Sequence, residues 1–174
     1  EVYYLYPPEA LNGSPIFLSS HDTPRIPNTI ANELMKNEEE YENVFDIDKD
    51  PRWYNSKGEF DTYAFRCWEF ENDGIPEEIA EEVLKKHMLI VFLQYTFPGL
   101  PSISAGDEVG VLGLKDPNNR KTFPWDKLEK ILQKDDIESI EARLYDFYCK
   151  IGAFRMNYRE VFSDSRNFRI LYIS

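Results

Sequence analysis

A histidine and a carboxylate stand side by side in this sequence, two residues after a short apolar run. The run is Ile16 to Leu18, and the pair is His21 and Asp22. Prolines at positions 15, 24 and 27 surround the run, which favours a buried strand over a helical turn. Parallel α/β sheets and barrels bind ligands at the carboxyl ends of their strands, so the pair is a candidate binding site. The alternative is that Asp22 caps a turn and His21 has no role.

The elements that would position this pair alternate between strands and helices. We predict strands at 16–18 and 100–105, helices at 29–35, 76–96, 126–134 and 137–158, and a closing strand at 168–173. Asn28 is the predicted N-cap of the first helix, and Asp126 with Glu129 forms a predicted capping box. This order indicates an α/β fold.

Three segments resemble the α-amylase family of glycoside hydrolases. Residues 17–25 read FLSSHDTPR, which is similar to the fourth conserved region of that family. Residues 97–108 read FPGLPSISAGDE and resemble its eighth barrel strand. Residues 116–120 read DPNNR, are followed by FPW at 123–125, and resemble a loop of the cyclomaltodextrinase and neopullulanase branch. The three matches follow the family's order and span roughly residues 15 to 160.

The resemblance implies part of a (β/α)8 TIM barrel, namely its last two β/α units, with the start of a C-terminal β domain. We therefore expect residues 1–160 to be barrel, with an irregular insertion at 37–73, and residues 161–174 to hold the first strand of the β domain. A barrel of this kind needs eight units over about 250 residues. Two parallel strands cannot close it, so we expect a fragment of a larger enzyme that self-associates to cover its open faces.

The resemblance also assigns roles to four residues of a retaining α-glucan hydrolase. Asp22 is the catalytic carboxylate that stabilises the transition state, and His21 donates a hydrogen bond to the same sugar. Asp116 and Arg120 resemble a pair that binds a sugar farther from the cleaved bond. For that pair, a salt bridge within the loop is an equally simple explanation.

The family's nucleophile and its acid/base glutamate lie on strands four and five, and no stretch of this chain resembles either. We therefore expect the chain to lack hydrolytic activity alone. Asp107 and Glu108 are not a substitute pair, because adjacent residues at a strand end point to opposite faces. They are predicted to be structural. An alternative function is that of a non-catalytic amylase-like module for binding or assembly.

Composition limits the partners. The net charge of −12 disfavours nucleic acid and anionic membranes, so the expected partner is an α-glucan oligosaccharide. Hydrophobic residues make up 42% of the chain, which indicates a globular protein. Two cysteines favour a reducing compartment such as the cytoplasm over a disulfide framework. Residue 1 is Glu, so we expect the true N-terminus upstream and predict no location.

The segment 37–73 is acidic and aromatic at once. It holds twelve acidic against four basic residues, together with nine aromatic residues. We interpret it as an ordered insertion, either a lid or binding loop or a surface that packs its own small core. Its Asp46, Asp48 and Asp50 are spaced like a calcium loop, but Pro51 and Lys57 occupy positions that need Gly and Glu. We predict no metal or cofactor, although the family resemblance allows a structural calcium ion in a longer parent protein.

Overall fold

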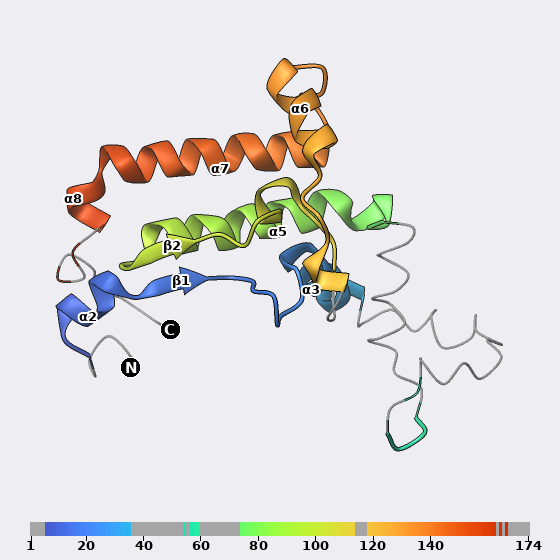
Figure 1. The fold of residues 1–174 in the computed structure, drawn as a ribbon, viewed down its shortest axis with the longest axis horizontal. Helices are drawn as coiled ribbons and strands as arrows, with labels where there is room; N and C mark the ends of the chain where they lie inside the picture. Colours follow the sequence, from blue (N-terminus) through green and yellow to red (C-terminus); the bar gives the residue numbers. More distant parts are fainter. Residues whose placement is uncertain are drawn as a thin grey trace.

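Two short parallel strands form the sheet in the part of the protein that the structure describes. The structure, a computed structural model, describes residues 6–35, 54, 56–59, 74–113, 118–162, 164 and 166. Strand β1 (Pro15–Phe17) pairs in parallel with β2 (Leu100–Ser102), with Ile16 opposite Pro101. A parallel pair needs a crossover connection, and the described part of this connection contains the helices α3 (Ile26–Met35) and α5 (Glu77–Thr96). The predicted strand at 16–18, the beginning of the one predicted at 100–105 and their parallel pairing are confirmed (Figure 1).

The second predicted strand is too long. Pairing ends at Ser102, and the chain soon turns at Gly106, whose φ of 102° lies in the left-handed region. A 3-10 helix, η3 (Asp107–Val109), follows. Asp107 and Glu108 therefore lie on a helical turn rather than at a strand end, so the alternation argument used for them was wrong. Their predicted structural role is considered below.

Helix α5 lies at the centre of the described core. On one side, Val83 packs with residues of α3, including Ile30. On another, Leu84 and Val91 pack with Leu144 of α7 (Ile140–Asn157). Figure 1 shows α5 and α7 side by side, with the two strands beneath α5. These two contacts bury Val83, Leu84 and Val91, but they do not cover every apolar residue in the second half of α5.

Both predicted side-chain caps are wrong. Helix α3 begins at Ile26, so Asn28 lies in its first turn, where its Oδ1 accepts a hydrogen bond from Gly113 N at 2.7 Å. Helix α6 (Trp125–Gln133) follows Pro124 without a side-chain cap, and Glu129 instead accepts a bond from Gln133. Pro124 occupies the N-cap position and has no side-chain oxygen that could accept a hydrogen bond, which accounts for the missing cap.

The last long helix begins three residues later than predicted. Ser139 caps α7 by accepting a hydrogen bond from Ala142 N at 3.1 Å. Two short helices, α2 (Pro8–Gly13) and α8 (Arg159–Phe162), precede β1 and follow α7. Most of the insertion 37–73 and the closing strand 168–173 lie outside the described residues, so the predicted domain boundaries stay predictions. Across the described helices, none is long and apolar enough to cross a membrane.

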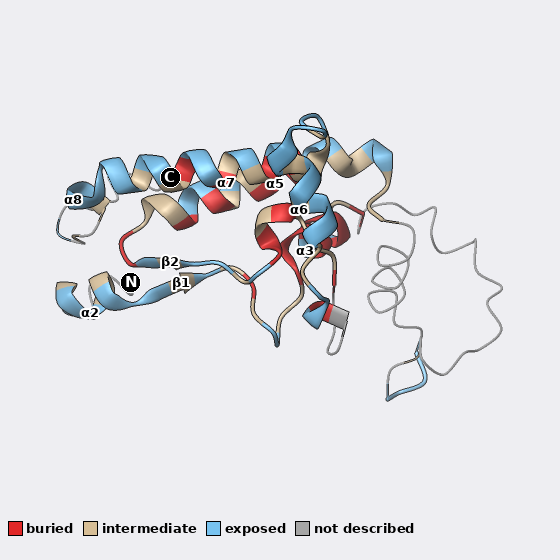
Figure 2. Cartoon of the chain, turned by 45° about the horizontal axis from the view of Figure 1, so that its top comes forward, coloured by how far each residue is buried: buried red, intermediate tan, exposed pale blue. Residues whose placement is uncertain are grey.

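The predicted burial of the first strand is wrong within the described structure. Phe17 is 59% exposed and Leu100, in the neighbouring strand, is 57% exposed. Leu89, Phe92 and Leu93 of α5 are also exposed. Figure 2 shows β1 and β2 largely in the colour of exposed residues. In the described part of the chain, each strand has a single neighbour, so much of its apolar surface remains in contact with solvent.

We predict that these exposed side chains cause the chain to self-associate. Exposed apolar surface favours association in water. Sedimentation velocity should give a mass above that of one chain, which increases with concentration. A double substitution of Phe17→Ser and Leu100→Ser should shift the distribution toward monomer. A wild-type chain that stays monomeric at every concentration would contradict the prediction.

Candidate functional site

The His21–Asp22 pair lies on a tight turn at the carboxyl end of β1. Within this turn, Ser20 N donates to Thr23 Oγ1 at 2.7 Å, and Thr23 N donates to Ser20 O at 3.3 Å. His21 Nε2 is 3.0 Å from Asp22 Oδ2, and the two side chains are 67% and 70% exposed. Both side chains are therefore accessible to a ligand while the backbone beneath them is bonded.

Arg120 approaches the same carboxylate from the opposite loop. It ends the short 3-10 helix η4 (Asn118–Arg120), and its Nη2 lies 3.5 Å from Asp22 Oδ1. Ninety-eight positions separate the two residues in sequence. The group thus combines one carboxylate that accepts hydrogen bonds with an imidazole and a guanidinium that donate them. Such a set can orient a molecule that carries several hydroxyl groups.

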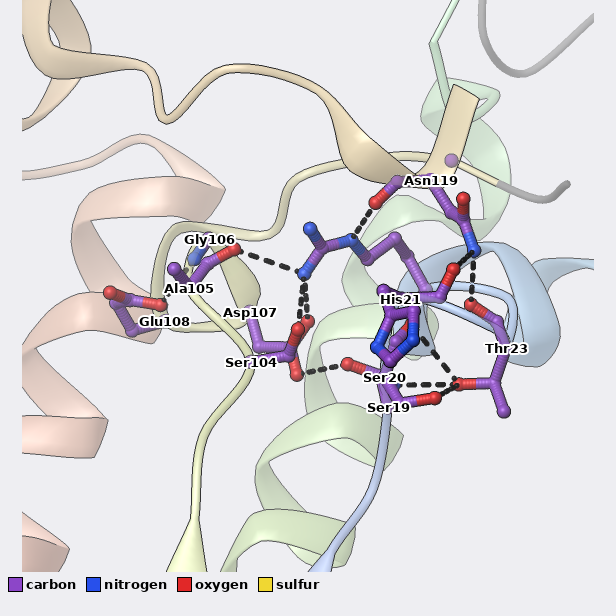
Figure 3. A network of polar contacts seen from close by, with 12 residues as sticks. Ser19, Ser20, His21, Thr23, Ser104, Ala105, Gly106, Asp107, Glu108 and Asn119 are labelled. Atoms are coloured by element: carbon purple, nitrogen blue, oxygen red, sulfur yellow. Dashed lines mark hydrogen bonds and ion pairs between the residues drawn. The ribbon is translucent and has the colours of Figure 1, made fainter. Parts of the chain in front are cut away.

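A buried ion pair lies beneath this surface group. Arg25 Nη1 is 3.0 Å from Asp107 Oδ1, and the side chains are only 6% and 2% exposed. Ser19 Oγ donates to the other carboxylate oxygen of Asp107, and Arg25 Nη1 also donates to the carbonyl oxygen of Ala105 at 3.0 Å. The network ties the end of β1 to the segment after β2 (Figure 3).

The buried position of Asp107 disfavours the charged form of its carboxyl group. Burial raises the pKa of the Asp107 carboxyl, and the hydrogen bonds from Ser19 and Arg25 act in the opposite direction. The carboxylate can remain charged only because these partners surround it. Glu108, its neighbour, accepts a bond from Gly106 N at 2.8 Å. Both acidic residues are thus engaged within the protein, in agreement with their predicted structural role.

Comparison with known proteins gives several relatives that match part of the chain. Amylopullulanase of Thermoanaerobacterium thermosulfurigenes is 38% identical over 87 residues, half of this chain. Amylopullulanase of Thermoanaerobacter thermohydrosulfuricus is 45% identical over 65 residues, or 37% of the chain. Cyclomaltodextrinase of Thermoanaerobacter pseudethanolicus is 29% identical over 83 residues, or 48% of the chain. The chain is a partial relative of the α-amylase family.

The relationship to the α-amylase family covers little of those enzymes. The matched stretch spans 4% of each of the two amylopullulanases and 13% of the cyclomaltodextrinase. No family model matches the chain, and no solved structure matches it. The relatives are glycosidases, so the predicted resemblance to glycoside hydrolases is confirmed. They also imply a TIM-barrel-like fold, and the mixture of several helices with few strands seen here is compatible with one.

Three of the four predicted site residues come together in the structure. His21, Asp22 and Arg120 form one group, whereas Asp116 lies outside the described residues. Arg120 has a further interaction in addition to its contact with Asp22. Neither alternative for the Asp116–Arg120 pair is therefore decided. The roles assigned to all four residues stay predictions.

Sequence reasoning missed the residues that hold the site. Arg25 falls inside the matched segment 17–25, but nothing in the sequence identified Asp107 as its partner. Asn119 was also missed, although it lies within the DPNNR motif. Its Nδ2 donates to the carbonyl oxygens of His21 at 2.7 Å and Thr23 at 3.1 Å. The position of Asn119 beside Arg120 in that motif was the only available signal.

Metal binding stays untested. Among the described residues, His, Cys, Asp and Glu side chains do not gather in groups of three or more that could hold an ion. The segment 46–57, which is spaced like a calcium loop but is predicted not to bind the ion, lies mostly outside those residues. The expectation of no cofactor therefore remains a prediction.

Proposed function

We propose that this chain supplies the sugar-binding side of the active site of a retaining α-glucan hydrolase. The observation that carries the proposal is the exposed group of His21, Asp22 and Arg120 at the carboxyl ends of two parallel strands. In a barrel, these strands would be the last two of eight. The partial relationship to amylopullulanases and cyclomaltodextrinases supports an oligosaccharide of α-linked glucose as the ligand.

Each residue has a role that its chemistry allows. The Asp22 carboxylate accepts hydrogen bonds from two hydroxyl groups of the sugar in the reacting subsite, and His21 donates one to the same sugar. Bonds that strengthen as the ring flattens toward an oxocarbenium ion lower the barrier rather than only the ground-state energy. Arg120 holds an adjacent sugar, since its guanidinium can bind vicinal hydroxyl groups.

The chain is proposed to bind sugar without hydrolysing it. A retaining glycosidase needs a nucleophilic carboxylate and a carboxylic acid about 5–5.5 Å apart. No segment here resembles the family regions that carry these two groups, and Asp107 is engaged with Arg25. Added maltohexaose should therefore stay intact. Turnover that disappears on Asp22→Ala would contradict this part of the proposal.

Asp22→Ala should abolish measurable binding of maltohexaose. The substitution removes the acceptor of the site and leaves His21 and Arg120 without their shared carboxylate, while the fold should be little affected because the side chain is exposed. Isothermal titration calorimetry measures the affinity. The matched control is Asp126→Ala, which removes an exposed carboxylate on α6 and should bind like the wild type. Equal affinities for all three proteins would mean that any sugar binds outside the group of His21, Asp22 and Arg120. That result would favour the alternative of a non-catalytic amylase-like module.

A further inference from the structure

Asn119 connects the two loops of the candidate site. Its side chain is buried, with 1% of the residue exposed. Its amide nitrogen donates to the carbonyl oxygens of His21 and Thr23, which flank Asp22 on both sides. Figure 3 shows the side chain of Asn119 directed at this turn. Both hydrogens of the amide group are thus used to hold the backbone on either side of the candidate catalytic carboxylate.

The backbone of Asn119 is held in turn by the buried ion-pair network. Its carbonyl oxygen accepts a hydrogen bond from Arg25 Nε at 3.0 Å. The next residue is Arg120, which contacts Asp22. Asn119 therefore fixes the turn that carries Asp22 through its side chain, and its backbone anchors the segment that carries Arg120.

The ion pairs of the Asp22 carboxylate contribute little to its orientation. The carboxylate meets His21 and Arg120 at the surface, and exposed ion pairs of this kind contribute little because solvent screens them. The position of the carboxylate must then come from its backbone. The only described side-chain donor that bonds the carbonyl groups on both sides of Asp22 is Asn119.

The chemistry of the contact requires an amide. Two carbonyl oxygens need two N–H donors, which an aspartate of the same shape cannot supply. Asn119 Oδ1 has no hydrogen-bond partner among the described residues. The hydrogen bonds of this side chain are therefore those that its two N–H groups donate. We propose that Asn119 is a positioning residue that fixes the turn 20–23, so that His21 and Asp22 face the sugar together. The proposal rests on the function proposed above.

The test compares Asn119→Asp with the wild type and with Asn28→Ala. Asn28 is also fully buried, and the bond that the substitution removes is the one its Oδ1 accepts from Gly113 N, which lies outside the turn 20–23. Thermal unfolding measures stability, calorimetry measures maltohexaose affinity, and ¹H–¹⁵N NMR follows the backbone amides of residues 20–23. The ring signals of His21 give a second reporter, since the chain has only one other histidine.

We expect both variants to be less stable than the wild type. Asn119→Asp alone should shift the amide signals of residues 20–23, speed their hydrogen exchange and weaken maltohexaose binding about tenfold or more. Asn119→Ser keeps one donor, so its maltohexaose affinity and its amide signals should lie between those of the wild type and those of Asn119→Asp. It provides a milder variant if Asn119→Asp does not fold. Asn28→Ala should keep wild-type affinity and wild-type signals in the turn.

Two results would overturn the role of Asn119: unchanged amide signals in the turn of Asn119→Asp, or a loss of affinity no larger than that of Asn28→Ala. Failure of the wild type to bind maltohexaose is a separate outcome. It would refute the proposed function, and the amide signals would then decide by themselves whether Asn119 fixes the turn.

Discussion

Replacing Arg25 with methionine is expected to lower the free energy of unfolding by about 3–5 kcal/mol, measured by urea unfolding at pH 7. The substitution leaves the buried Asp107 carboxylate without its counter-charge. It also removes hydrogen bonds to the carbonyl oxygens of Ala105 and Asn119. A loss of this size is a large fraction of the 5–15 kcal/mol that stabilises a typical domain.

Two further measurements identify the cause. The double variant Arg25→Met/Asp107→Leu should recover part of the loss, because no unpaired charge remains in the interior. The loss in Arg25→Met should also shrink as the pH falls. Burial already raises the pKa of Asp107, removal of Arg25 raises it further, and a protonated carboxyl needs no counter-charge. A double variant less stable than Arg25→Met would mean that the charge is not the main reason for the loss.

Acidification from pH 7 to pH 4 is expected to cost about 3 kcal/mol through His87 alone. This side chain is 1% exposed and lies 3.3 Å from the hydroxyl of Tyr148, across the α5–α7 contact. Burial lowers the pKa of His87 from 6.5 to about 4. Between those values the unfolded chain binds a proton that the folded chain does not, so stability is full above pH 6.5 and falls toward pH 4.

His87→Gln isolates this contribution, because glutamine does not titrate and can still bond the Tyr148 hydroxyl. Urea unfolding of both proteins at several pH values should show a steeper loss for the wild type between pH 6.5 and 4. Other titrating groups, such as Asp107 with its raised pKa, also change the free energy of unfolding with pH. They are present in both proteins, so the difference between the two curves reports on His87. Parallel curves for the two proteins would show that His87 is not buried in its neutral form.

Local signals made much of the fold predictable from the sequence. Helix α5 begins after Pro76 and ends before Pro98 and Gly99, as predicted, because these residues act on the backbone at their own positions. The predicted cap at Asn28 failed for the opposite reason. Asn28 bonds Gly113, 85 positions away, so its preference for a helix start was overridden by a tertiary contact.

The same distinction separates the predictable and unpredictable parts of the site. His21 and Asp22 are adjacent in sequence, so their proximity could be read directly. The bonds from Arg25 to Asp107 and from Asn119 to His21 join residues 82 and 98 positions apart. A single sequence contains no local pattern for such pairs, and only the fold brings them together. The exposure of β1 was also unpredictable from the sequence, because the burial of a strand depends on how many elements pack against it.

The shared network beneath the site has a consequence for protein engineering. Segment 19–25 depends on Asp107 and Asn119 for its buried bonds, and each of these depends on Arg25. A chimera that receives segment 19–25 from another protein, without 104–107 and 119, would leave the buried Asp107 carboxylate without its counter-charge or the carbonyl groups of the turn without their donor. These three pieces therefore form a single transplantable module, and a library that varies one of them should vary the other two with it.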